Sequence, residues 1–476
     1  RLLGEIKRDK EFFHLRFINQ GKQLLAADEK GVLHLFDVKT SKELLKLIST
    51  ETGWTVVDNK GRFDSSEKGM KNVSWEAEDD ELPIDSFSGT HYEPGLLASH
   101  LEDQSFINKQ PTVVQQGIKL PPEVVITVPD GNRVALVPFV VKVEAQGLGG
   151  GVDEINLYHN GKVVVPTAVL KSGEETKDKL VKKTVEFKLL PTVGSNKFKV
   201  IATNKMGIEG YSDEVSIDFE GKKQKTTLHI LTVGVNKYRD SRLNLDYSVA
   251  DAAEISNSFR KSQFAVYDDM MHHELRDNEA TKKSILKQLH EISNYSQNDV
   301  MVLYLAGHGL AVEGEWYYLP HETMLQDNQN YYTQVGVSAK EIQNILAESK
   351  IQHVMVMIDA CYSGAGLKAF RKLQDTQRHF SRGLSKSVGV VVLAATRKDQ
   401  EAAELSDLGH GLFTYVVSEG MDGKADLKPK NAKVSAHEIS DYSTETIPTF
   451  SRKYLGAAQE PTSFTMGSDF VLLRKQ

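Results

Sequence analysis

The sequence of 476 residues contains only one cysteine, Cys361. A single cysteine cannot form an intramolecular disulfide, and one thiolate cannot build a cysteine-rich zinc site. Two roles remain for this residue: a reactive thiol, or a small hydrophobic side chain buried in the core, which is the usual fate of a free cysteine. A lone usable thiol also suits a reducing compartment, so we expect a cytoplasmic protein.

Other features are missing as well. No stretch approaches 18 uninterrupted apolar residues, so we expect no contact with a membrane. The net charge of −7 gives no reason to expect direct nucleic-acid binding. His272 and His273 are adjacent and would diverge on a regular element, and no EF-hand spacing is present, so we predict no metal site and no cofactor. The glycines of 147–151 lack the Gly-Lys-Ser/Thr ending of a phosphate-binding loop and predict a flexible connection.

The length predicts two to three domains, and the first 220 residues are typical of β structure. Residues 1–75 form a β-rich segment, in which "LLAADEKGVLHLFDVKTSKELLKL" (24–47) resembles one blade of a WD-repeat propeller. One blade cannot bury both of its faces, so we expect further blades upstream of Arg1; a small β extension packed on the next domain is the alternative. We expect residues 76–120 to be an irregular connector. We expect residues 121–220 to form an immunoglobulin-like β-sandwich with a tight hairpin at Asn160-Gly161.

From residue 226 to 476 the pattern changes to strands that alternate with helices. We expect strands at 228–235 and 388–395 and helices at 250–259, 284–292 (capped by Thr281) and 340–346. This alternation predicts a mainly parallel sheet with helices on both faces. The fold class is therefore α/β, preceded by all-β modules.

Two apolar runs in this region end in residues that can carry chemistry. Residues 300–306 run into Gly307-His308-Gly309, and 356–360 run into Cys361 and then Gly364. Catalytic groups of open α/β sheets collect at the carboxyl ends of the strands. His308 and Cys361 are 53 residues apart, close to the roughly 50 between the histidine and the cysteine of caspase-type proteases. The pair predicts a cysteine protease.

The C-terminal region resembles the caspase-like peptidases, and the metacaspase and bacterial orthocaspase branch more than the animal caspases. Four segments in family order carry the resemblance: "LTVGVNKYRDSRLNLDYSVADAAEI" (231–255), "YLAGHGL" (304–310), "MIDACYSG" (357–364) and "DLGHGLFTYVVSEGMDGKAD" (407–426). The resemblance implies that Cys361 is the nucleophile and His308 the proton shuttle of a dyad. The backbone N–H groups of Gly309 and Cys361 would then stabilise the oxyanion. Some metacaspases need calcium, and that dependence stays open here.

The resemblance also implies a specificity for basic residues. Animal caspases have glutamine where Asp359 stands. In the metacaspase pattern this acid and a second one, matched by Asp251, line the pocket for an arginine or lysine of the substrate. Asp251 could instead cap a helix, and Asp359 could accept bonds from backbone donors at the strand end. Ser248 and Ala306 depart from the family, which commonly has cysteine and serine there.

Residues 365–387 connect the cysteine-bearing strand to the next strand and are strongly basic. Two interpretations are open, a solvated loop and an activation linker. In the second, the candidate processing sites are Lys368, Arg371, Lys372, Arg378, Arg382 and Lys386. We expect a zymogen that acts on protein substrates and is activated by a partner or a protease. The alternative is a silent caspase-like scaffold that works through its β domains.

Overall fold

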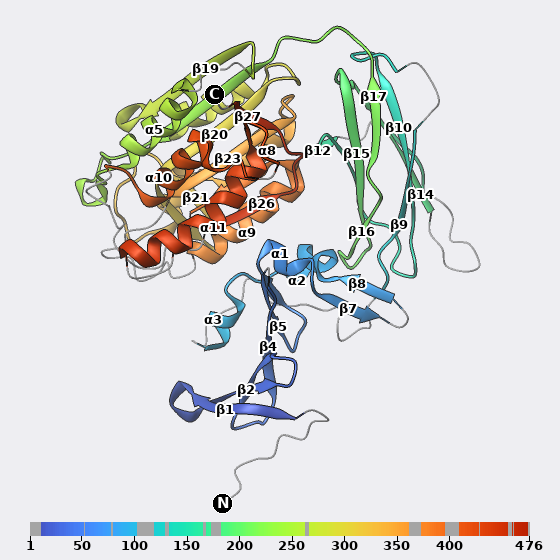
Figure 1. The fold of residues 1–476 in the computed structure, drawn as a ribbon, viewed down its shortest axis with the longest axis vertical. Helices are drawn as coiled ribbons and strands as arrows, with labels where there is room; N and C mark the ends of the chain where they lie inside the picture. Colours follow the sequence, from blue (N-terminus) through green and yellow to red (C-terminus); the bar gives the residue numbers. More distant parts are fainter. Residues whose placement is uncertain are drawn as a thin grey trace, which may run out of the picture.

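The computed structural model describes residues 11–51, 53–77, 80–101, 119–128, 133–164, 168–172, 182–261, 266–360, 373–395, 409–427, 429–455, 459 and 461–474. Cys361 lies outside these residues. Three units follow one another along the chain (Figure 1). The N-terminal unit lies below the other two, and the second unit, a β-sandwich, stands beside the C-terminal α/β unit.

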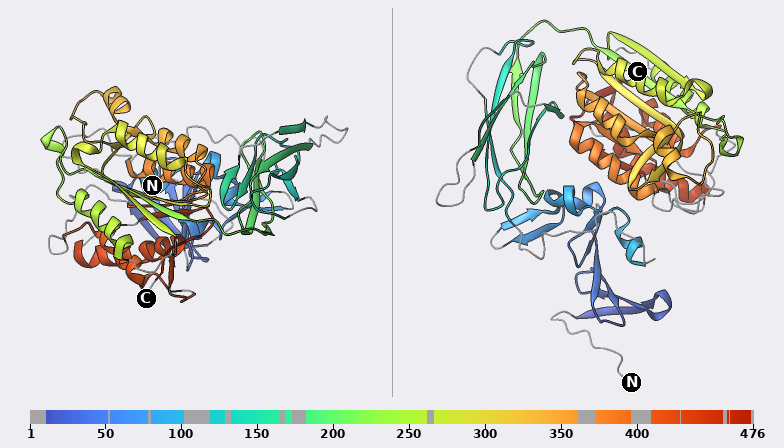
Figure 2. Two further views of the ribbon diagram at one scale, coloured as in Figure 1. Left: turned by 90° about the horizontal axis from the view of Figure 1, so that it is seen from above. Right: turned by 180° about the vertical axis from the view of Figure 1, so that it is seen from behind.

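The N-terminal unit is built on one antiparallel meander of six strands. The strands are β1 (Phe12–Ile18), β2 (Gln23–Asp28), β3 (Leu33–Asp37), β4 (Glu43–Ser49), β5 (Trp54–Asp58) and β6 (Phe63–Ser65), with the turn η1 (Asn19–Gly21) after β1. Figure 2 shows that this sheet projects away from the rest of the molecule. The propeller-blade assignment stays a prediction.

The segment expected to be an irregular connector contains regular elements where it is described. They are α1 (Glu67–Met70), β7 (Ser74–Ala77), β8 (Asp80–Pro83), η2 (Ile84–Phe87), α2 (Ser88–His91) and α3 (Leu96–Leu101). Phe63, Ile84, Phe87 and Tyr92 form a small buried core here. Helix α3 covers β5 through Leu96, which packs with Val56 in a separate buried cluster. The apolar residues in this polar stretch are few, but they are enough to fold it onto the meander.

The second unit has two facing antiparallel sheets. One sheet has the order β13-β14-β10-β9, and the other β12-β11-β15-β16 with β17 beside β15. The bounds are β9 (Glu123–Thr127), β10 (Phe139–Gln146), β11 (Ile155–His159), β12 (Lys162–Val164), β13 (Ala168–Ser172), β14 (Lys182–Leu189), β15 (Gly194–Thr203), β16 (Glu209–Tyr211) and β17 (Val215–Phe219). Alternate residues such as Val141, Leu157, Phe187 and Val200 fill the space between the sheets.

The C-terminal unit has a mainly parallel sheet of order β19-β18-β20-β23-β24-β26, in which only the pairing of β24 with β26 is antiparallel. Its strands are β18 (Thr227–Gly234), β19 (Asp269–Arg276), β20 (Val300–Val312), β23 (His353–Ala360), β24 (Val391–Ala394) and β26 (Thr462–Thr465). The strands β21 (Glu315–Leu319) and β22 (Val337–Ser338) extend it from β20, and β25 (Lys433–Ser435) pairs with β27 (Val471–Arg474). The α/β fold class is confirmed.

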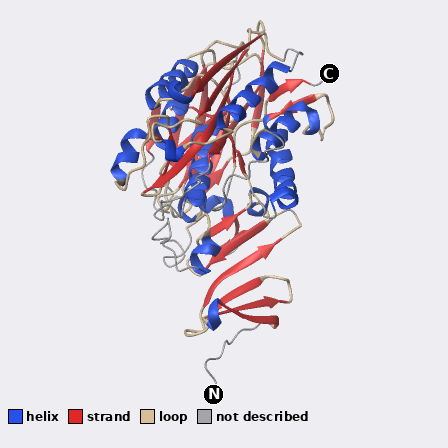
Figure 3. Cartoon of the chain, turned by 90° about the vertical axis from the view of Figure 1, so that its left-hand side faces the viewer, coloured by secondary structure: helices blue, strands red, loops and turns tan. Residues whose placement is uncertain are grey.

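Helices cover both faces of this sheet (Figure 3). One face packs on α5 (Ser248–Lys261), α10 (Leu412–Glu419) and α11 (Ala436–Leu455). The other face packs on α6 (Lys282–Ser293), α7 (Gln329–Val335), α8 (Ala339–Glu348) and α9 (Leu373–Leu384). Short turns complete the unit: η3 (Ser241–Leu243), η4 (Asp277–Glu279), η5 (Ser385–Gly389) and η6 (Gly420–Lys424). No helix among the described residues has both the length and the apolar character that a membrane crossing requires.

Two local expectations can be compared with these elements. Thr281 is the N-cap of α6, where its side chain accepts from the Ser284 N–H, so the predicted cap is confirmed. The strand expected over 388–395 is shorter: β24 begins at Val391, because residues 385–389 form a wide π-helical turn instead. Val388 is still buried, which explains why its hydrophobicity suggested a strand.

The sandwich is anchored to the α/β unit by the hairpin between β11 and β12. Asn160 and Gly161 both have positive φ, as this tight turn requires, and Gly161 lies against the backbone of Ser468 and Gly389. Lys162 donates from Nζ to the carbonyls of Ser349 and Ile351 just after α8. The tip of the sandwich therefore packs directly against backbone atoms of the α/β unit.

Candidate active site

His308 lies where β20 leaves the main sheet. Up to Gly307, the strand pairs in parallel with β23, and the last pair is Gly307 with Ala360. From His308 onward it pairs antiparallel with β21. The next residue after Ala360 in the sequence is Cys361, so the described register ends one residue before each member of the predicted dyad. The strand continues to Val312, so His308 lies where β20 changes partners and not at the strand end that the sequence predicted.

One loop, which follows β18, contacts the buried His308 side chain and backbone. The imidazole Nε2 donates to the carbonyl oxygen of Leu243 over 2.9 Å. The His308 N–H donates to the phenol oxygen of Tyr238 over 2.8 Å, and the two rings lie 5.1 Å apart. The sequence offered no aspartate or asparagine to orient His308, and in the structure a backbone carbonyl has that role.

The two predicted specificity acids come together on one face of the sheet. Residues alternate between the faces along a strand, so Asp359 on β23 and Tyr304 on β20 both point toward the layer of α5 and α10. Asp251 lies on α5 in that same layer. Both acids are buried. The Tyr304 hydroxyl lies 3.3 Å from Asp359 Oδ2, and burial, followed by the charges of Asp359 and Asp251, raises the pKa of this phenol well above its ordinary value.

The start of helix α10 contacts both acids. The N–H of Gly411, the N-cap, donates to Asp251 Oδ1 over 2.8 Å. One turn further, Thr414 Oγ1 donates to Asp359 Oδ2 over 3.2 Å, and Tyr304 donates to the same oxygen over 3.3 Å. A helix N-terminus favours carboxylates near it. The acids are thus hydrogen-bond acceptors for a helix end and for buried hydroxyls.

The imidazole of His410 lies at the edge of the two acids. Its Nδ1 lies 3.7 Å from Asp251 Oδ1, and the side chain is 28% exposed. Asp251 is in the first turn of α5, as the capping alternative requires, and its carboxylate also reaches residues 410 and 411 at the start of α10.

The two predicted oxyanion donors are described only in part. Gly309 continues β20 into its antiparallel half, and a Cβ there would come within 2.8 Å of Trp316 Nε1. The need for glycine at 309 therefore has a packing cause in addition to the predicted approach of substrate. Cys361, the other donor and the predicted nucleophile, lies outside the described residues.

The basic segment between Cys361 and β24 differs from the expected loop. Lys368, Arg371 and Lys372 lie outside the described residues, but from Leu373 the chain forms helix α9. Arg378, Arg382 and Lys386 follow one another at intervals of four residues, so all three point from one side of the helix toward the β units. The expectation of a solvated loop is wrong for this half of the segment.

Each of these three cations meets an acid from a different part of the β units. Arg378 binds Asp64 of β6 through two bonds of 2.8 and 3.1 Å and is 9% exposed. Arg382 pairs with Asp85 of η2, and its guanidinium lies over the ring of Tyr92. Lys386 pairs with Glu209 of β16. Helix α9 is therefore fixed to the N-terminal unit, and the turn η5 that follows it is fixed to the sandwich.

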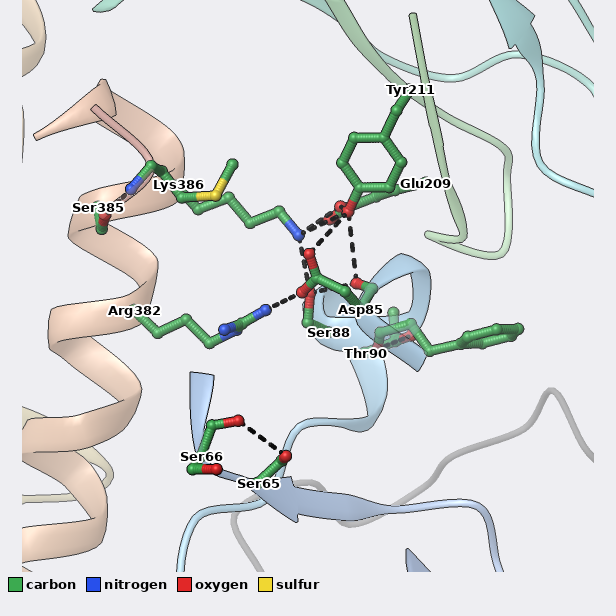
Figure 4. Close-up of polar contacts among 12 residues, drawn as sticks. Ser65, Ser66, Asp85, Ser88, Thr90, Glu209, Tyr211, Arg382, Ser385 and Lys386 are labelled. Carbon is green, nitrogen blue, oxygen red and sulfur yellow. Dashed lines mark hydrogen bonds and ion pairs between the residues drawn. The ribbon is translucent and has the colours of Figure 1, made fainter. Parts of the chain in front are cut away.

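Figure 4 shows how closely the second and third of these pairs approach each other. Lys386 and Arg382 extend from the helix toward Asp85, while Glu209 and Tyr211 reach in from the sandwich. Lys386 Nζ also donates to Ser88 Oγ over 2.7 Å. Burial by itself raises the pKa of Asp85, but the Lys386 and Arg382 cations hold it below its ordinary value. A protease could not reach Arg382 or Lys386 in this arrangement, which argues against cleavage of the folded protein at these positions.

Sequence reasoning did not identify several residues of the site. Tyr238, Leu243, Tyr304 and Thr414 all lie inside the segments that carry the resemblance, but tyrosine, leucine and threonine there have no pattern that signals a role. His410 and Gly411 form a Gly-His-Gly of their own, at 409–411. That repetition of the motif around His308 is the one signal that could have drawn attention to the start of α10.

No three His, Cys, Asp or Glu side chains gather to hold a metal ion in the part of the chain that the structure describes.

Comparisons with known proteins identify the C-terminal unit. Residues 228–462 match the family model of the caspase domain. A search of the curated proteins found no match. Among solved structures, "structure of pro-sf-caspase-1" is similar over 52% of this chain and 93% of that one, at 10% identity and a TM-score of 0.29.

Two further solved structures are similar at lower scores. Astrotactin-2, a vertebrate-specific perforin-like membrane protein, has 14% identity and a TM-score of 0.16, with 45% of this chain and 37% of that one covered. The purple acid phosphatase PPD1 from seeds of yellow lupin (Lupinus luteus) has 9% identity and a TM-score of 0.15, with coverage of 75% and 63%. TM-scores of this size do not establish a common fold, so the similarity of this chain to known proteins depends on the family match.

The matched residues begin in β18 and end in β26, so they span the central strands of the sheet. The C-terminal unit is therefore the part of the chain that is similar to caspase domains. The match supports a caspase-like cysteine peptidase, a hydrolase that acts on protein substrates.

Proposed function

We propose that this protein is an endopeptidase of the metacaspase and orthocaspase branch that cleaves after arginine or lysine through a dyad of Cys361 and His308. The observation that supports it most is the position of His308. It is buried directly after the last pair of β20 with β23, Gly307 with Ala360, and its ring is oriented by the Leu243 carbonyl.

The proposed chemistry follows from the nitrogen that is bonded. With Nε2–H directed at Leu243, Nδ1 is the nitrogen that would take the proton from the Cys361 thiol. The thiolate would attack the carbonyl carbon of the scissile peptide, and the N–H groups of Gly309 and Cys361 would stabilise the oxyanion. His308 would then protonate the leaving amine, and water would hydrolyse the thioester.

The proposed specificity depends on the two acids. Asp251 and Asp359 place two carboxylates in one buried region that also contains the Tyr304 hydroxyl. A guanidinium or ammonium group entering there would be attracted to both, whereas a substrate aspartate would add a third negative charge. Asp359 accepts from the hydroxyls of Tyr304 and Thr414 on the face of the sheet where Asp251 lies, which supports its role in the pocket.

We place the proposed activating cleavage in the first half of the basic segment, after Lys368, Arg371 or Lys372. These residues precede helix α9, while Arg378, Arg382 and Lys386 are held in ion pairs. A cut before α9 would release the chain that follows Cys361 without disturbing the attachment of the helix to the β units.

The test is hydrolysis of fluorogenic peptides that end in arginine, lysine or aspartate, with the wild type compared with Cys361→Ala. We expect hydrolysis of the basic peptides that depends on Cys361. If no peptide is hydrolysed even after limited trypsin treatment to cut the basic segment, the protease proposal is wrong, and the scaffold alternative gains. If the aspartate peptide is preferred, the pocket assignment is wrong.

A further inference from the structure

The backbone around His308 has an unusual shape. Gly307 has φ +151°, a conformation that side chains disfavour, at the point where β20 changes partners from β23 to β21. A Cβ at Gly307 would come within 2.9 Å of the Tyr238 hydroxyl and 3.0 Å of the Tyr318 hydroxyl. Two phenol groups therefore occupy the space that the missing side chain leaves.

The two phenols bond the backbone on either side of this glycine. Tyr318, on β21, donates to the carbonyl of Ala306 over 2.8 Å. Tyr238, in the loop after β18, accepts from the N–H of His308 over 2.8 Å. Both side chains are buried, and burial raises the pKa of both phenols above the ordinary value, so each keeps its proton.

Tyr238 is held in turn by its own loop. Its N–H donates to Asn244 Oδ1, and the preceding N–H groups of Asn236 and Lys237 both donate to Asp277 Oδ1. The same loop carries Leu243, whose carbonyl binds His308 Nε2. A single braced loop thus fixes both the backbone and the ring of the histidine.

We propose that Tyr238 and Tyr318 are positioning residues for the dyad, with Tyr238 the more important. The inference rests on the proposed function, because it gives these phenols the task of keeping His308 directed at Cys361. Without the Tyr238 hydroxyl, the buried N–H of His308 loses the hydrogen bond of 2.8 Å that fixes the backbone at this point. Without the Tyr318 hydroxyl, the Ala306 carbonyl still accepts from the Val235 N–H, so the loss is smaller.

The variants are Tyr238→Phe and Tyr318→Phe, which keep the ring and remove only the hydroxyl. Tyr332→Phe is the matched control, because Tyr332 is also a buried tyrosine whose hydroxyl bonds backbone, at Gln326, away from the dyad. We expect kcat for an arginine peptide to fall about tenfold in Tyr238→Phe and about threefold in Tyr318→Phe, in line with one lost hydrogen bond. KM should change less than twofold, and Tyr332→Phe should keep the wild-type kcat.

A second readout does not need peptidase activity. Cys361 is the only cysteine, so the pH dependence of alkylation by iodoacetamide reports its thiolate alone. We expect the alkylation profile of Tyr238→Phe to move to higher pH, toward that of His308→Ala, while Tyr332→Phe follows the wild type. If Tyr238→Phe and Tyr332→Phe have the same profile and the same kcat, the inference is overturned. If the wild type and His308→Ala already coincide, the dyad itself is wrong, which is a separate failure.

Discussion

Thr414 at the start of α10 donates a hydrogen bond of 3.2 Å to Asp359 at the end of β23, although 55 residues separate them in the sequence. The hydroxyl of Tyr304 also donates to Asp359, over 3.3 Å, and lies 2.7 Å from Thr414 Oγ1. The two hydroxyls fix one carboxylate oxygen of the proposed specificity pocket. Tyr304 belongs to the neighbouring strand β20 and Thr414 to the helix that covers this face, so the pocket forms only when the helix packs on the sheet.

The first prediction concerns the two pocket acids. Asp359→Asn and Asp251→Asn keep the shape and remove the charge, so each should lower kcat/KM for arginine peptides roughly 30-fold to 4000-fold, since a buried partner of a cation is worth about 2–5 kcal/mol. The measurement is steady-state hydrolysis of the arginine and lysine peptides. Asp441→Asn, an exposed acid on α11, is the control and should match the wild type. Equal kcat/KM in all three variants would contradict the assignment.

The second prediction locates self-processing. Fragments of active protein should end at Lys368, Arg371 or Lys372 and not at Arg378, Arg382 or Lys386, because the latter three are held in ion pairs with the β units. Mass spectrometry of the incubated protein identifies the ends. Cys361→Ala should stay intact, and the triple variant Lys368→Ala, Arg371→Ala, Lys372→Ala should lose the cuts. A wild-type fragment that ends at Arg378 would speak against an anchored helix α9.

The third prediction concerns the pair of Arg378 and Asp64. Arg378→Met leaves the buried Asp64 carboxylate without its bidentate partner, which should cost about 3–5 kcal/mol of stability. Thermal unfolding followed by calorimetry measures the loss in the transition that involves the α/β unit. The control is Lys142→Met, whose pair with Glu144 is on the surface of the sandwich and should be dispensable. Equal transition temperatures for the two variants would show that the buried pair does not hold the units together.

The fourth prediction is a pH dependence at the junction of the sandwich and the α/β unit. His159 Nε2 donates to Asn196 Oδ1 over 2.7 Å, and Gln352 Nε2 donates to its Nδ1 over 3.0 Å. A second proton on the imidazole would go to Nδ1, where it would face the N–H of Gln352. Burial lowers the pKa of His159 to about 4. Between the ordinary pKa of about 6.5 and this value, the unfolded chain binds the proton and the folded chain does not, so stability falls as pH decreases.

The size of this effect is about 2 kcal/mol at pH 5 relative to neutral pH. Unfolding by urea at pH 7 and pH 5 measures it. His159→Gln cannot take the proton and should lose that part of the pH dependence, whereas His290→Gln, at an exposed position of α6, should keep it. If the two variants respond to pH alike, His159 is not the responsible group.

The sequence was informative where function depends on strand ends. His308 and Asp359 each follow an apolar run, and such runs end at the carboxyl edge of a parallel sheet, so both residues could be placed in advance. Their supports could not. Tyr238 and Leu243 act on His308 through a phenol oxygen and a backbone carbonyl, and neither group is visible in a pattern of residue types.

Helix α9 shows a different limit. Its glutamines, basic residues and glycine look like a solvated loop because their partners are remote: 314 residues separate Arg378 from Asp64. Local patterns contain no information about a charge pair formed between units, so the basic content suggested exposure. The Asn160-Gly161 turn was predicted correctly as a hairpin, but its docking into the next unit depends on the shape of the surface around Ser468 and Gly389.

The attachment of α9 and η5 to the two β units has a thermodynamic consequence. Suppose a ligand of the N-terminal meander binds the attached and the detached arrangements with different affinities. At saturation, this ligand changes the equilibrium constant between the attached and the detached arrangements by the ratio of its two affinities, which is the largest change it can produce. A peptide bound at the candidate active site that prefers one arrangement must in turn change the affinity for that ligand, and the two effects are equal in size. The coupling can therefore be measured in two ways: as the affinity of the meander for its ligand with and without a bound peptide, or as the affinity for the peptide with and without that ligand.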